Sequence, residues 1–329
     1  MREAEVIERL RRIATAPEAR GLLDDAAVLD GMVITHDSIA EGVHFLPEDP
    51  PASVGWKLVA VNLSDLAAKG ATPAAALLSL TLAGDGEWED LFLGGVEAAC
   101  ESYGLQLIGG DTLTLPDGAP RVLGLTAIGR AGERVPARDG GRVGDGLWLI
   151  GTLGDSAAGL AQLQRDKRAT GPLVDIFRRP IPLLGAGQAS APLAHAMMDV
   201  SDGLLLDARR MAQASGCAIA IELGDLPLSN AFVDARGDDL EARLFAATGG
   251  DDYALLGAFA SDFDPATLSL PSGTRMVRIG ALEAGGPQLR LAHHGEPVQL
   301  PERLGFEHDS ADHRSQPRPA PASPVADRH

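Results

Sequence analysis

Aspartates recur along this chain where short apolar segments end. The apolar run 32–34 predicts the end of a buried strand, and Asp37 follows it closely. Asp111 and Asp199 come after further apolar runs in the same way. Carboxylate oxygen is the ligand that a hard cation such as Mg²⁺ prefers, so these strand ends predict a cation site if the fold brings them together. Each acid taken alone is also explained as a residue of an ordinary polar loop.

Convergence of these acids would have a physical consequence. Several carboxylates in one place repel one another, which raises their pKa values and destabilises the fold. Divalent cations remove that conflict, and they also bind the phosphates of a nucleotide. The aspartates that lie at turns or in apolar company are Asp24, Asp25, Asp37, Asp65, Asp111, Asp199 and Asp202.

The composition is that of a globular protein of about two domains. The chain has 329 residues, of which 45% are hydrophobic. No apolar run approaches the length that spans a membrane, and the charged residues 3–14 predict an amphipathic helix rather than a signal peptide. The two cysteines, Cys100 and Cys217, provide neither a disulfide framework nor a zinc-ligand spacing. These features predict a cytoplasmic protein.

The charge of the chain is strongly negative, with a formal net value of −18 at pH 7. An acidic surface repels nucleic acid and anionic membranes, so we expect neither as a partner. Only three lysines occur, Lys57, Lys69 and Lys167. If the substrate is a phosphate, another cation must neutralise it, and bound Mg²⁺ is the obvious candidate.

Hydrophobic periodicity predicts a two-domain α+β fold. Helices are predicted at residues 3–14, 53–70, 88–103 and 204–215, and strands at 74–82, 121–130, 147–150, 218–223, 276–282 and 288–291. Pro172 and the prolines that follow it predict irregular chain. The Gly- and Arg-rich loop 134–146 predicts a boundary between domains at 1–140 and 141–308. Residues 309–329 are rich in Ser, Pro, Ala and His, which predicts a disordered tail.

The predicted helix 53–70 carries polar residues inside an apolar segment. Asn62 and Asp65 are three positions apart, so they share one face of the helix. A carboxylate in apolar company needs a partner or a metal ion. The alternative is an ordinary ion pair between Asp65 and Lys69, four residues further along the helix.

Two groups of closely spaced polar residues carry different geometric expectations. Asp24 and Asp25 are adjacent at the start of a predicted strand, where successive side chains face opposite sides, so at most one of them would point into a site. Asp199 and Ser201 are two apart and face the same way. Asp202 precedes a predicted helix, where capping that helix is the alternative role.

Two glycine-rich segments suit the binding of phosphate. The Gly-Gly pair before Asp111 lets a phosphate approach backbone N–H groups, while a glycine turn capped by Asp111 is the alternative. The loop 151–154 enters a helix at Asp155 or Ser156, as anion-binding helix starts do. The chain has neither a Gly-x-x-x-x-Gly-Lys-Ser/Thr loop nor a protein-kinase signature. Any phosphoryl transfer must therefore use another scaffold.

Seven segments of the chain form an ordered set: 24–28, 37–45, 61–73, 107–112, 151–160, 199–204 and 249–253. In this order they resemble the thiamine-monophosphate kinases, within the superfamily typified by aminoimidazole ribonucleotide synthetase. The similarity extends from about residue 20 to about residue 306.

The resemblance implies an aminoimidazole ribonucleotide synthetase-like fold, with an N-terminal sheet domain that binds ATP and metal and forms a homodimer, and a C-terminal α/β domain. It implies ATP-dependent phosphorylation of thiamine monophosphate to thiamine diphosphate, by direct in-line transfer with several Mg²⁺ ions and no catalytic side chain. The implied metal ligands are Asp25, Thr35, His36, Asp37, Asp65, Asp111, Asp199 and Asp202. The implied ATP contacts are Tyr103, Gly110, Asp111, Arg138 and Ser201, and the implied contacts to thiamine monophosphate are His44, Asp251 and Phe306.

Four positions depart from the pattern of the family. Leu23 replaces a glycine, Thr114 an arginine, Asp251 a glutamate and Phe306 a tryptophan or tyrosine. The alternative enzymes are other ATP-using members of the superfamily: the ribonucleotide synthetase, the selenophosphate synthetase and a hydrogenase-maturation protein. The last two carry a functional cysteine near one end of the chain, whereas both cysteines here are internal. A non-catalytic protein that binds thiamine phosphates or nucleotide is the alternative of a different class.

Overall fold

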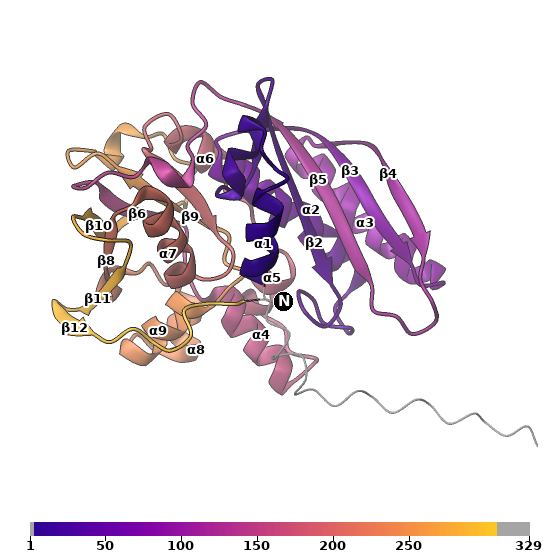
Figure 1. The fold of residues 1–329 in the computed structure, drawn as a ribbon. Coiled ribbons are helices and arrows are strands. Elements are labelled where there is room, and N and C mark those ends of the chain that lie inside the picture. The colour runs from indigo at the N-terminus through magenta and orange to yellow at the C-terminus, as the bar shows by residue number, and fades with distance from the viewer. Residues whose placement is uncertain (1–2, 308–329) are drawn as a thin grey trace, which may run out of the picture.

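The computed structural model describes residues 3–307, which form two β-sheets with helices packed against them (Figure 1). This architecture confirms the predicted two-domain α+β fold. The tail predicted at 309–329 lies outside the described residues, and the domain boundary predicted after residue 140 stays a prediction. Within residues 3–307, every helix is too short or too polar to cross a membrane. The cytoplasmic location also stays a prediction.

The N-terminal sheet has five strands in the order β1-β2-β5-β3-β4. All neighbouring pairs are antiparallel except β3 and β4, which are joined through helix α3. Figure 1 shows this sheet from the face opposite to α2 and α3, where no helix within residues 3–307 covers β3, β4 or β5. The elements of this half are α1 (Glu3–Arg11), η1 (Pro17–Leu22), β1 (Ala27–Leu29), β2 (Met32–Ala40), α2 (Pro51–Ala68), β3 (Thr72–Leu82), α3 (Gly86–Tyr103), β4 (Gln106–Thr114) and β5 (Val122–Arg130).

Strands β2 and β4 extend past the points where the sequence predicts that they end. Asp37 pairs with Leu125 inside the β2–β5 ladder, and Asp111 pairs with Ser79 inside the β3–β4 ladder. Neither acid therefore follows its strand. Polar residues continue these strands because backbone pairing with the neighbouring strand outweighs the local loss of apolar character.

The C-terminal sheet has seven strands in the order β12-β11-β8-β10-β6-β9-β7. Its strands are β6 (Gly146–Ile150), β7 (Ala196–Val200), β8 (Ala218–Glu222), β9 (Ala254–Phe259), β10 (Met276–Glu283), β11 (Leu289–His293) and β12 (Glu296–Val298). Its helices are η2 (Arg138–Gly140), α4 (Asp155–Arg165), α5 (Pro172–Arg178), α6 (Leu184–Ser190), α7 (Leu204–Ser215), η3 (Leu223–Asp225), α8 (Asn230–Arg236), α9 (Leu240–Thr248) and η4 (Pro265–Thr267).

The chain after Pro172 is helical, where the sequence predicts irregular structure. Pro172 stands in the first turn of α5, where the backbone N–H that proline lacks would have no helical partner. Helix α6 follows after the next two prolines. The prolines therefore mark helix boundaries and leave the segments between them free to form short helices.

Helix α2 is buried on all sides and belongs to the cores of both halves. One side of it packs against β2 and β5, and its C-terminal part packs against α6 and β7. The backbones of α2 and α6 approach so closely that a Cβ on Gly187 would lie 2.0 Å from the carbonyl oxygen of Ala67. A shared apolar cluster joins Ala67 and Ala68 to Ile150, Ala186 and Leu255. Helix α2 therefore fixes the two sheets relative to each other.

Candidate active site at the junction of the two sheets

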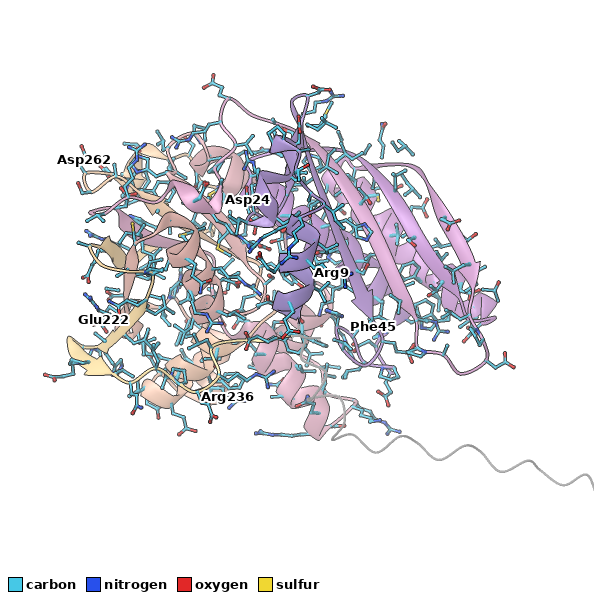
Figure 2. All side chains as sticks on the ribbon, in the orientation of Figure 1. Arg9, Asp24, Phe45, Glu222, Arg236 and Asp262 are labelled. Atoms are coloured by element: carbon cyan, nitrogen blue, oxygen red, sulfur yellow. The ribbon has the colours of Figure 1, made fainter. Side chains whose placement is uncertain are left out.

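Aspartates from distant parts of the chain meet around α2. Asp25 precedes β1, Asp65 lies on α2 and Asp199 lies on β7. One carboxylate oxygen from each lies within 4.8 Å of the other two. Asp37, on β2, is close enough for its charge to raise the pKa of both Asp65 and Asp199. Asp24, next to Asp25, lies between the two halves of the molecule in Figure 2.

Uncharged groups hold three of these acids in place. The hydroxyl of Thr35 donates a hydrogen bond to the carboxylate of Asp65. The Ser64 hydroxyl donates to Asp199 Oδ2 at 2.7 Å. The backbone N–H of Asp37 donates to Oδ1 of Asn62 at 2.9 Å. One turn of α2 thus positions acids from β2 and β7 as well as its own.

The electrostatics of this group fit a hard divalent cation. Burial raises the pKa of Asp37 to about 6, and the charges of Asp25 and Asp202 add to that shift. Burial, followed by the charges of neighbouring acids, raises the pKa of Asp65 and Asp199 well above the ordinary value. Clustered carboxylate and hydroxyl oxygens are the ligands that Mg²⁺ prefers, and its charge would relieve the repulsion.

Asp25 and its neighbour Asp24 are neutralised by the chain itself. The ammonium group of Lys69 lies 2.5 Å from Asp24 Oδ1, 2.6 Å from Asp25 Oδ2 and 2.9 Å from the carbonyl oxygen of Met197. Arg138 forms a second ion pair with Asp25. Burial acts to raise the pKa of Asp25, but the charges of Arg138 and Lys69 hold it below the ordinary value.

Asp24 and Asp25 lie in a bend before β1, and both contact Lys69. Only Asp25 joins the cluster with Asp65 and Asp199. Lys69 makes its ion pairs with these two acids and not with Asp65, because it follows the last helical residue of α2 and turns toward β1. The ordinary ion pair within the helix is therefore absent.

A cavity of about 340 Å³ opens beside the acids, between the two halves of the molecule. The three residues predicted to contact thiamine monophosphate, His44, Asp251 and Phe306, all line it. Ser201, a predicted ATP contact, does so too. The remaining lining residues are Asp37, Ser38, Ile39, Val43, Val61, Ser156, Ala157, Leu160, Phe177, Asp202, Gly250 and Tyr253.

A buried lysine that the sequence analysis did not single out lies behind one wall of this cavity. Lys57 Nζ donates to Asp251 Oδ2 at 2.8 Å and to the carbonyl oxygen of His44 at 2.9 Å. The Tyr253 hydroxyl donates to the other oxygen, Asp251 Oδ1, at 2.8 Å. The signal in the sequence is a lysine on an apolar stretch of helix, since a buried lysine requires an acceptor.

The start of helix α4 already has a carboxyl group of the protein against it. Both carboxylate oxygens of Asp252 lie 2.9 Å from the backbone nitrogen of Gly154, which precedes the helix. Asp155 accepts hydrogen bonds from Thr152 and Ser229 instead of capping the helix. The anion position predicted here is therefore filled by a side chain of the protein.

Some predicted site residues lie away from the acids. His36 points to the open face of β2, where its Nδ1 is 2.9 Å from the Thr126 hydroxyl. Asp111 and Gly110 lie on the exposed edge strand β4. Tyr103, the last residue of α3, packs against the ring of Trp56 on α2 and does not line the cavity.

Arg138 and Gly110, two of the predicted ATP contacts, have structural roles in this conformation. Arg138 is engaged with Asp25. Gly110 has a φ of +156°, and a Cβ there would lie 1.9 Å from the carbonyl oxygen of Leu78. The close approach of strand β3 therefore requires glycine at this position, whether or not a phosphate binds nearby.

Comparison with known proteins places the chain in a family. Residues 23–131 match the AIR synthase related protein N-terminal domain, and residues 142–257 match the corresponding C-terminal domain. The thiamine-monophosphate kinase of Salmonella typhimurium is 37% identical over 305 residues, which cover 88% of this chain and 91% of that protein.

Solved structures agree with the sequence relatives. The structure described as "AaThiL complexed with AMPPCP and TMP" is 32% identical, with a TM-score of 0.81, and the match covers 94% of this chain and 97% of that one. The thiamine monophosphate kinase of Aquifex aeolicus is also 32% identical, with a TM-score of 0.77 and coverage of 91% and 100%. The chain therefore belongs to the AIR synthase related proteins and, within them, to the thiamine-monophosphate kinase family.

Proposed function

We propose that this protein transfers the terminal phosphoryl group of ATP to the phosphate of thiamine monophosphate, which yields thiamine diphosphate. The observation that carries this proposal is one cavity, lined by His44, Asp251 and Phe306, that opens directly beside Asp37 and Asp202. The related AaThiL structure is described as a complex with AMPPCP, an ATP analogue, and TMP. An acceptor held in the cavity would have its phosphate next to the acids.

Different residues that line the cavity suit the phosphate and the organic part of this acceptor. The backbone N–H of Ala40 donates to His44 Nδ1 at 3.1 Å, so in the neutral ring the proton lies on Nε2, which is then a donor suited to a phosphate oxygen. Phe306 and Phe177 offer ring faces to the organic part of the substrate. Asp251 offers carboxylate oxygens as hydrogen-bond acceptors.

The acids suit a transfer reaction that depends on charge neutralisation. Asp25, Asp37, Asp65, Asp199 and Asp202 would hold Mg²⁺, which would neutralise the phosphate groups of both reactants. The protein's part is to hold these carboxylates in a fixed geometry from several elements and to exclude water by burial. Direct in-line transfer fits such a site, since phosphoryl transfer relies on positioning and electrostatics more than on covalent help from the protein.

We also propose that two copies of the chain pair through the open face of the five-stranded sheet. Leu77, Ile108, Leu113 and Val122 are exposed large apolar residues on β3, β4 and β5. An uncovered sheet with such residues requires a partner surface. Pairing would place Asp111 of one copy, on β4, against the second copy, where it could complete that copy's site.

Turnover of thiamine monophosphate tests the proposed reaction. The purified protein is incubated with ATP, Mg²⁺ and thiamine monophosphate, and thiamine diphosphate is separated by chromatography. We expect product that depends on both ATP and Mg²⁺, and no product from the Asp37→Asn variant. Binding of thiamine monophosphate without any turnover would instead identify a non-catalytic binding protein.

Mixing two inactive variants tests whether copies share a site. Asp37→Asn and Asp111→Asn are each expected to abolish turnover as homodimers. If Asp37 and Asp111 of different copies serve one site, a heterodimer of the two variants has one intact site, and random reassortment restores roughly a quarter of the wild-type rate. A mixture that stays inactive, or a monomer in sedimentation experiments, would contradict the shared site.

A further inference from the structure

Lys57 joins two loops that come from opposite halves of the molecule. Its side chain is 2% exposed and extends from the buried helix α2. One hydrogen bond reaches the carbonyl oxygen of His44, in the loop after β2, and the other reaches the carboxylate of Asp251, in the loop before β9. Both of these loop residues line the cavity. A single ammonium group therefore sets the distance between two parts of the cavity wall.

The carboxylate of Asp251 is held at both oxygens. Lys57 binds Oδ2, and the Tyr253 hydroxyl binds Oδ1. Burial, followed by the nearby charge of Asp251, raises the pKa of Tyr253 well above its ordinary value, so Tyr253 keeps its proton and remains a donor. Both oxygens of the carboxylate keep further lone pairs, which can accept hydrogen bonds from a ligand.

The backbone of this loop is strained in a way that serves the same arrangement. Asp251 has a φ of +66° and Tyr253 a φ of +53°, a left-handed conformation that non-glycine residues rarely adopt. The backbone N–H of Asp251 donates to the carbonyl oxygen of Ser201 at 2.7 Å, and that of Tyr253 donates to Val200 at 2.8 Å. Strain of this kind persists where the surrounding structure holds it, and it is concentrated at binding sites.

The exposed fractions of the Lys57 and Asp251 side chains indicate different roles for these two residues. The side chain of Asp251 is 25% exposed and lines the cavity, whereas that of Lys57 is 2% exposed and lies behind it. The ammonium group lies 4.1 Å from the centre of the Phe177 ring, which also lines the cavity. Lys57 therefore reaches a ligand only through Asp251, His44 and this ring.

We propose that Lys57 is a positioning residue that sets the specificity of the cavity for its acceptor substrate. It fixes the backbone of His44, whose ring we assign to the phosphate, next to Asp251, which we assign to the organic part of the substrate. Because Lys57 offsets the charge of Asp251, the carboxylate acts as an oriented hydrogen-bond acceptor for a ligand N–H group, such as an aromatic amine. This inference rests on the proposed function, since it assigns His44 and Asp251 to one thiamine monophosphate molecule.

The Lys57→Met variant tests this inference, because methionine fills similar space without the charge. We expect the Kd for thiamine monophosphate from calorimetry, and its KM, to rise about tenfold, while the KM for ATP stays unchanged and kcat changes less than about threefold. The matched control is Lys167→Met, which removes a lysine whose side chain is 70% exposed. The control should leave every constant unchanged.

A milder variant keeps the test decisive if Lys57→Met does not fold. Tyr253→Phe removes only the hydroxyl that binds Asp251, and we expect it to raise the Kd for thiamine monophosphate about threefold with the KM for ATP unchanged. Equal weakening for both substrates, or normal binding of thiamine monophosphate by an active enzyme, would overturn the inference alone. A wild-type protein that neither binds nor phosphorylates thiamine monophosphate would overturn the proposed function, and the inference with it.

Discussion

The two sides of the acid cluster differ in how their charge is balanced. On one side, Asp24 and Asp25 are paired with Lys69 and with arginines of the chain, and the pKa of Asp25 is lowered. On the other side, Asp65 and Asp199 receive hydrogen bonds from Thr35 and Ser64, which carry no charge, and their pKa values are raised. Burial is nearly complete on both sides.

The difference shows where an external cation is expected. A buried carboxylate is costly unless it is paired, so the side with internal cations is stable as it stands. The other side keeps an unrelieved repulsion in the folded protein, which a bound divalent cation would remove. The chain's own cations thus neutralise part of the charge of Asp24 and Asp25, and the unrelieved charge of Asp37, Asp65 and Asp199 remains for a ligand. Four measurements test this contrast.

The largest effect is expected for Asp199→Asn, on the side without internal cations. Loss of the charge should lower kcat about 10⁴-fold, or roughly 5.5 kcal/mol of activation free energy. The free energy of unfolding in EDTA should rise by about 1 kcal/mol, because one repelling charge is gone. Steady-state kinetics and urea unfolding measure the two quantities. A near-normal rate, or a less stable variant, would remove the basis of the contrast.

Removal of Lys69 tests the opposite side. Lys69→Met leaves Asp24 and Asp25 without their shared ammonium group and should lower the free energy of unfolding by about 3–5 kcal/mol. The control Lys167→Met breaks an exposed ion pair with Glu48 and should change it by less than about 1 kcal/mol. Equal effects for the two lysines in urea unfolding would show that the internal cations carry no special stability.

The pH dependence of stability should be reversed relative to that of a typical paired carboxylate. The pKa of Asp37 is raised to about 6 from an ordinary 3.8, so the stability linked to its protonated form is present at low pH and lost as pH rises through about 6. Asp207, with a pKa raised to about 7 by burial, acts in the same direction. The loss for Asp37 alone is at most about 3 kcal/mol.

Thermal unfolding in EDTA between pH 4 and pH 8 measures most of this loss. Stability of the metal-free protein should fall as the pH rises across that range, and saturating Mg²⁺ should restore about 2–3 kcal/mol at pH 8. The Asp37→Asn variant should show a flatter profile than the wild type. A metal-free protein that becomes more stable from pH 5 to pH 8 would contradict the assignment.

The smallest effect on stability is expected at Asp111, which is exposed on the edge strand β4. Asp111→Asn should change the free energy of unfolding of one copy by less than about 0.5 kcal/mol, because no buried charge is altered. Its stability in EDTA should follow the wild-type pH profile. A stability gain like that of Asp199→Asn would show that Asp111 belongs to the buried cluster.

Much of the fold and part of the site could be read from the sequence. The long helices and most strands carry clear periodicity, and Asp65 on an apolar helix face indicated a polar site. The extension of β2 past Asp37 could not be predicted, because it depends on pairing with β5 rather than on local preference. The position of Asp111 on an open sheet face depends in the same way on strand order, which no local pattern encodes.

The sequence by itself determined which acids and glycines are present, the helices and strands that carry them, and the family to which the chain belongs. Only the tertiary structure decided how the charges are shared: Lys69 with Asp24 and Asp25, Lys57 with Asp251, and Asp252 at the start of α4. The physical reason is that these partners are brought together by the packing of α2 between two sheets. A side chain's neighbours in space, and not those in the chain, determine its electrostatic environment.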